Sequence, residues 1–129
     1  MTYSANKKSK YCTTIKDIPL VPLTKESQTR FLAADGVLFS FIENPPNCVF
    51  PMHKHEAMQV LIVLEGTEDH VCGDETFHME AGDVCIHPSN MMHGGKTTTG
   101  FKGIDIFVPP REDYLALMAK HGLPVKAPR

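Results

Sequence analysis

The sequence predicts an all-β domain, a sandwich or barrel of short strands followed by one short helix. β-branched and aromatic runs recur along the chain, as at residues 37–42, 60–64 and 104–108. Turn sequences rich in glycine, proline and asparagine separate the runs, at 34–36, 44–47, 73–75, 81–83 and 88–90. Many short strands at this spacing, without an internal repeat, are typical of a closed or two-layered β architecture.

The helix is predicted over about residues 111–121. Two prolines precede it, Glu112 and Asp113 lie in its first turn, Lys120 lies in its last turn and Gly122 follows. Its apolar side consists of Tyr114, Leu115, Leu117 and Met118. We expect this side to pack on the barrel, with a subunit interface as the alternative.

The length and charge of the chain narrow the classes of function. With 129 residues, 42% of them hydrophobic, the chain can bury one core, and one domain is expected over residues 11–129 after a polar, disordered segment at 1–10. The net charge is only −2, so no excess charge points to nucleic acid or to a membrane surface. No apolar run approaches the roughly 20 residues that span a bilayer.

The cysteines and the N-terminus predict a cytoplasmic location. The widely spaced cysteines form no CxxC pair, which indicates reduced thiols rather than a disulfide framework. The first ten residues carry positive charge but no apolar stretch follows them, so we do not expect a signal peptide.

A cluster of ligand-capable residues predicts a metal site. If residues 53–63 are extended throughout, His53, His55 and Gln59 share one face of a strand, followed by apolar side chains. Two histidines at this spacing, with a third donor four residues on, favour a divalent cation over a patch of surface histidines.

The metal residues lie in two longer stretches that resemble the two cupin motifs, HxH(x)3E(x)6G and G(x)5PxG(x)2H. The first stretch is His53-Lys54-His55-Glu56-Ala57-Met58-Gln59 with Gly66 beyond it, and the second runs from Gly82 through Pro88 to His93. The resemblance covers about residues 35–110 and implies a single jelly-roll barrel. It also implies one divalent metal held by His53, His55, Gln59 and His93, for which nickel, zinc, iron, cobalt and manganese are all suitable.

Two positions depart from the cupin pattern. Asn90 replaces the glycine of the second motif, and because asparagine tolerates positive φ, we expect the turn to remain intact. Gln59 replaces the usual glutamate, so the ligand set is neutral and the cation keeps its full charge. Such a site favours Lewis-acid catalysis, in which the cation polarises an oxygen of an anionic substrate, over the activation of dioxygen.

Four further histidines are not chosen as ligands. We expect His87, His70 and His78 to be surface residues or to contact the metal ligands without binding the metal. His121 falls in the last helical turn, where the helix dipole favours a cation.

An acid interrupts the apolar strand before the helix. By alternation Asp105 and Phe107 share one face and Ile104, Ile106 and Val108 the other, so if the second face packs inward, Asp105 looks into a different space such as the barrel mouth. A buried carboxylate needs a partner, and a structural pair between Asp105 and Arg111 is the alternative to a role in the site.

The first motif with Gln59, followed by Asp105-x-Phe107-x-Pro-Pro-Arg111, is similar to the KdgF-type cupins of pectin and alginate breakdown. These proteins convert 4,5-unsaturated uronates into linear ketonised sugars. The resemblance implies that Asp105, Phe107 and Arg111 are catalytic residues beside the metal, that the substrate is a small anionic sugar and that the protein is a homodimer. Alternatives are an iron-dependent cupin dioxygenase of the quercetinase or thiol type and a non-catalytic sugar-binding cupin.

Overall fold

The computed structural model describes residues 2–3 and 9–125. Its elements, in chain order, are the 3-10 helix η1 (Ile15–Asp17), β1 (Val21–Pro22), β2 (Gln28–Ala34), β3 (Val37–Asn44), β4 (Cys48–His53), β5 (Met58–Cys72), β6 (Glu75–Glu80), β7 (Val84–His87), β8 (His93–Thr97), β9 (Phe101–Val108) and α1 (Glu112–Lys120). Disorder at residues 1–10 and a domain ending at 129 involve residues outside the described ones, so both stay predictions. Within the described part of the chain, no helix is long and apolar enough to cross a membrane.

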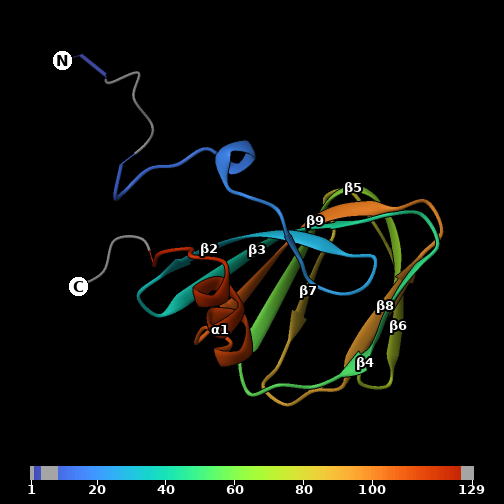
Figure 1. The fold of residues 1–129 in the computed structure, drawn as a ribbon. Coiled ribbons are helices and arrows are strands. Elements are labelled where there is room, and N and C mark those ends of the chain that lie inside the picture. The colour runs from blue at the N-terminus through green and yellow to red at the C-terminus, as the bar shows by residue number, and fades with distance from the viewer. Residues whose placement is uncertain (1, 4–8, 126–129) are drawn as a thin grey trace.

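The strands form an antiparallel sheet that curls into two layers (Figure 1). The first layer has the order β1-β2-β3-β9-β5-β7. In the second layer, the latter half of β5 pairs with β6 and β8, and β8 pairs with β4. The predicted all-β jelly roll with one C-terminal helix is confirmed.

Strand β5 passes from one layer to the other through a bend. Its register with β9 shifts between Val63 and Glu65, which is the mark of a bulge. The next residue, Gly66, has φ +78°, and a Cβ atom there would lie 2.0 Å from the Gly100 carbonyl oxygen. The glycine of the first motif is therefore required by the close approach of two backbones at the bend.

The turns lie where the sequence predicts them. Strands β5 and β6 form the hairpin that turns at Gly73 and Asp74. Asn90 adopts φ +62°, so the turn of the second motif survives the loss of its glycine, as predicted. The Asn90 N–H also donates to the His55 carbonyl at 2.8 Å, which ties this turn to the first motif.

Helix α1 closes one end of the barrel (Figure 1). Its buried Tyr114 packs against Phe31 of β2 and Phe107 of β9, with ring centroids 5.1 and 5.3 Å apart. Met118 joins the same cluster. The expectation that the helix packs on its own barrel is confirmed.

The barrel interior consists of two apolar clusters with a polar layer between them. Ala57, just before β5, belongs to one cluster and Leu61 of β5 to the other, and Gln59 lies between them. Along β9, Phe101 and Phe107 belong to opposite clusters and Asp105 lies between them. The candidate site is this polar layer.

Candidate metal centre

Three of the four predicted metal ligands come together at one end of the polar layer. His53 ends β4, His93 begins β8, and the two are paired across these strands. His55 lies in the loop between β4 and β5, so the segment is not extended throughout as the alternation argument assumed. The three histidines offer ligand atoms that all lie within 4.8 Å of one another.

Each of these imidazoles is oriented by a backbone carbonyl. Nδ1 lies 2.8 Å from the Pro51 oxygen in His53, 2.8 Å from the Ala57 oxygen in His55 and 2.7 Å from the Met91 oxygen in His93. A carbonyl can only accept, so each Nδ1 carries the hydrogen and each Nε2 keeps its lone pair. This is how proteins fix the tautomer of a metal-binding histidine.

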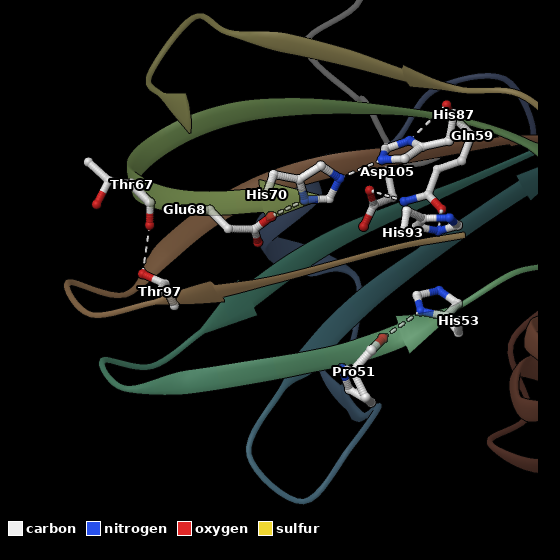
Figure 2. Close-up of polar contacts among 10 residues, drawn as sticks. All are labelled: Pro51, His53, Gln59, Thr67, Glu68, His70, His87, His93, Thr97 and Asp105. Atoms are coloured by element: carbon white, nitrogen blue, oxygen red, sulfur yellow. Dashed lines mark hydrogen bonds and ion pairs between the residues drawn. The ribbon is translucent and has the colours of Figure 1, made fainter. Parts of the chain in front are cut away.

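Gln59 reaches the same point from β5 (Figure 2). Its Oε1 lies 2.9 Å from Nε2 of His55 and 3.0 Å from Nε2 of His93. Its Nε2 donates to Oδ1 of Asp105 at 2.7 Å, which turns the amide oxygen toward the histidines. Three acceptors thus converge without a hydrogen between them, and the residues present fit a divalent cation held at that point.

Burial keeps the three histidines in the neutral form that binds metals. It lowers the pKa of His93 to about 3, and it also lowers the pKa values of His53 and His55. The positive charge of Arg111 lowers the pKa of the latter two further. Protons therefore compete poorly with a cation at neutral pH.

Asp105 lies behind Gln59, inside the barrel. Together with Phe107 it occupies the buried face of β9, whereas Ile104, Ile106 and Val108 are on the outer face and less buried. The condition that the isoleucine face packs inward is therefore not met, and Asp105 points into the barrel with Phe107. Burial raises the pKa of Asp105 to about 7, against the opposing hydrogen bond from Gln59.

Arg111 stands at the start of α1, at the rim of the same cavity. Its Nε and one terminal nitrogen donate to the two carboxylate oxygens of Asp113, at 3.0 and 2.7 Å. The guanidinium also lies 3.8 Å from the centroid of the Tyr114 ring and 5.4 Å from that of Phe107. Asp105 and Arg111 thus have different partners, and the structural pair considered above is not formed.

A small cavity of about 30 Å³ connects these residues. Of the predicted site residues it is lined by His53, Gln59, His93, Asp105, Phe107 and Arg111. The cavity is also lined by polar and aromatic residues that the sequence did not assign to the site, namely Asn44, Phe50, Glu68, His70, Phe101 and Tyr114. Asn44 is notable because its buried Oδ1 has no hydrogen-bond partner among the described residues.

The other histidines divide into two groups. His87 and His70 are buried, so a surface position is wrong for both, and they lie behind the predicted ligands. The alternation of side chains along the strands could have predicted their inward position. Glu68 and His70 are two residues apart on β5, so they share a face, and His87 is paired with the inward Gln59. His78 is exposed, as is His121 at the C-cap of α1.

A two-layered jelly roll with inward histidines from two motifs defines a cupin. The chain belongs to the family of AraC-like ligand-binding domains, which matches residues 36–111, more than half of its length. No curated protein matches its sequence.

Solved structures share the fold at low sequence identity. An RmlC-like cupin from Shewanella frigidimarina has a TM-score of 0.77 at 23% identity and covers 84% of this chain and 99% of its own. KdgF from Halomonas sp. has a TM-score of 0.72 at 22% identity, covering 77% and 93%. The polyketide cyclase RemF from Streptomyces resistomycificus has a TM-score of 0.69 at 24% identity, covering 78% and 80%.

Proposed function

We propose that this protein is a metal-dependent enzyme that converts 4,5-unsaturated uronates into linear ketonised sugars. The observation that carries the proposal is the position of Gln59, whose amide connects the metal-binding histidines to the buried Asp105. A neutral ligand set keeps the cation strongly electrophilic, and a carboxyl group with a pKa of about 7 can both hold and release a proton near neutrality. The likeness of fold to KdgF from Halomonas sp. is compatible with this function.

The chemistry of such a substrate requires the movement of one proton. The C4–C5 double bond makes the ring oxygen part of an enol ether. Opening breaks the bond between C1 and the ring oxygen, the anomeric hydroxyl loses its proton as C1 becomes an aldehyde, and the ring oxygen leaves as an enolate at C5. A proton added at C4 converts this enolate into a ketone. No oxidant, reductant or water is consumed, so a single acid–base group such as Asp105 is sufficient.

The remaining site residues suit the binding of an anionic sugar. A guanidinium has five N–H donors, more than the two that Arg111 uses on Asp113, so it can also bind the substrate carboxylate. Phe107 offers the ring face that shapes the sugar pocket. The unpartnered Oδ1 of Asn44 can accept from a sugar hydroxyl. A divalent metal bound by His53, His55, Gln59 and His93 would supply Lewis-acid polarisation of a substrate oxygen.

The test of this function is the Asp105→Asn variant, which keeps an acceptor oxygen for Gln59 but cannot exchange a proton. With unsaturated galacturonate generated by a lyase, we expect loss of the ultraviolet absorbance to slow by about 10²- to 10⁴-fold. Metal content should not change. The surface variant Asp69→Asn is the matched control. Full activity of Asp105→Asn with metal bound, or no turnover by the wild-type protein, would overturn the proposal.

A non-catalytic sugar-binding module is the second candidate, because the matching family is one of ligand-binding domains. For this function, the protein should bind saturated and unsaturated uronates with comparable affinity and leave both unchanged. Calorimetric titration followed by recovery and chromatography of the ligand distinguishes the two functions. The cytoplasmic location predicted from the sequence remains a prediction, and the free state of all four cysteines is compatible with it.

We further propose a homodimer formed through the outer face of the first layer. On β7 and β9, the two strands that flank β5, the exposed hydrophobic residues are Val84, Ile86 and Val108, and such a patch favours burial by a partner. Ile86→Lys should convert a dimer into a monomer in analytical ultracentrifugation. Val49→Lys is the control, because Val49 is equally exposed, at 64%, but lies on β4 in the other layer. A monomeric wild-type protein contradicts this arrangement.

A further inference from the structure

A second cluster of ligand-type side chains lies deeper in the barrel than the candidate metal centre. His70 of β5, with Cys85 and His87 of β7, offers three ligand atoms within 4.8 Å of one another. All three residues are buried, with exposed fractions of 5%, 8% and 0%. The proposed reaction uses none of them.

The two imidazoles of this cluster face each other through their Nε2 atoms, which are 2.6 Å apart (Figure 2). Nδ1 of His70 lies 2.5 Å from a carboxylate oxygen of Glu68, and Nδ1 of His87 lies 3.1 Å from the backbone oxygen of Gln59. Both oxygens can only accept from these rings, so each Nδ1 carries the hydrogen and each Nε2 presents a lone pair. Two lone pairs at this distance require a positive charge between them.

Glu68 has the position of a carboxylate that orients a metal-binding histidine. It is 4% exposed, and its bond to Nδ1 of His70 directs Nε2 of that ring toward His87 and Cys85. Gly95 leaves room for it, since a Cβ atom at Gly95 would lie 2.5 Å from Oε1 of Glu68. The backbone around the cluster is therefore shaped to place this carboxylate.

The charges of the cluster also suit a divalent cation. Burial raises the pKa of the metal-free Cys85 thiol to about 12, but a bound cation displaces the thiol proton. The resulting thiolate and the carboxylate of Glu68 together carry two negative charges, which neutralise a doubly charged ion in this buried space. Cys72 packs against the cluster that contains Cys85 and its thiol lies beside that of Cys85, so it can complete a four-coordinate set. Nitrogen and thiolate donors in such a set select zinc or cobalt over calcium or magnesium.

We propose that His70, Cys85 and His87 form a second metal site that binds a thiophilic divalent cation such as Zn²⁺, with Glu68 as the positioning residue of His70. This site is distinct from the one at His53, His55, Gln59 and His93, and its existence does not depend on the proposed reaction. The second ion links β5 to β7 behind Gln59, because the backbone of Gln59 holds His87.

The experiment is a Co²⁺ titration of the full chain after removal of metals with a chelator. We expect two equivalents to bind, and one of them should produce the thiolate-to-cobalt charge-transfer absorption of a cysteine ligand. Cys85→Ser combined with Cys72→Ser should abolish this absorption and leave one equivalent. His55→Ala should lose the other equivalent and keep the absorption. Glu68→Gln should weaken binding at the second site by about 10- to 100-fold.

Cys12→Ser is the matched control, because Cys12 is exposed and outside the cluster, and it should bind as the wild type does. The decisive reading is made on the wild-type protein, so it does not depend on the folding of a variant. Saturation at one equivalent without thiolate absorption would overturn the proposal and leave a shared proton between His70 and His87. Thiolate absorption that persists when both Cys85 and Cys72 are serine would also overturn it.

Discussion

At the scale of single residues, Gln59 decides the electrostatics of the candidate metal centre. Its amide oxygen faces His55 and His93, and its amide nitrogen donates to Asp105. A glutamate in its place would put a second carboxylate beside Asp105 and would have no hydrogen to donate. The neutral amide therefore lets a metal ligand and a buried carboxyl group be direct neighbours.

Gln59→Glu tests this role of the amide. The new carboxylate would compete with Asp105 for one proton and add an anionic ligand, so we expect metal to bind at least as tightly while turnover falls by about 10²-fold or more. Metal content and initial rates on unsaturated uronate measure the two effects. Gln28→Glu, an exposed change on β2, serves as the control. Wild-type turnover in Gln59→Glu would contradict the role assigned to the amide.

At the scale of elements, the antiparallel pairing of β5 with β9 builds the polar layer. Gln59 is opposite Phe107 and Leu61 is opposite Asp105, so the diagonal neighbours Gln59 and Asp105 can bond across the pair. Helix α1 then places Arg111 over the ring of Tyr114, at the rim of the cavity. Acid and cation thus come from two elements that are adjacent in the chain.

Asp113→Ala tests how α1 positions Arg111. Loss of the carboxylate that holds the guanidinium should raise KM for the uronate about 5-fold, equivalent to about 1 kcal/mol, and leave kcat nearly unchanged. Glu112→Ala removes the same charge from the same helical turn without touching Arg111, so it is the matched control. Steady-state kinetics of both variants provide the comparison, and equal KM values would show that Asp113 does not position Arg111.

At the scale of the whole molecule, the polar layer couples folding stability to pH. When the chain is metal-free, His87 and His93 stay neutral in the folded state because burial lowers their pKa values to about 4 and about 3. The unfolded chain binds protons on both below the ordinary value of 6.5. Asp105 acts in the opposite direction, because its pKa is raised from 3.8 to about 7 and the folded state holds that proton. Lowering the pH therefore destabilises the folded state through the two histidines and stabilises it through Asp105.

Between about pH 4.5 and 6, the unfolded chain binds about one proton more than the folded chain on these three groups. The two histidines are protonated only in the unfolded state, whereas Asp105 is protonated only in the folded state. As the pH is lowered through this range, the free energy of unfolding of the chelated protein should therefore fall by about 1.4 kcal/mol per pH unit. The fall should be steeper still because His53 and His55 contribute in the same direction. Asp105→Asn removes the opposing proton, so its slope should be steeper by about 1.4 kcal/mol per pH unit. Urea unfolding across this range measures both slopes, and parallel curves would exclude a raised pKa for Asp105.

The sequence by itself determined the fold class, the turns, the helix and the three motif histidines, because alternation, turn chemistry and motif spacing are local properties. Asn90 is an example, since its tolerance of positive φ was enough to predict an intact turn. The predicted ligation and catalysis remain to be tested. Only the tertiary structure decided that Asp105 bonds Gln59 rather than Arg111, and that His70 and His87 meet inside the barrel. Those contacts join residues 46 and 17 positions apart, and their geometry depends on how β5 bends between two layers, which no local pattern records.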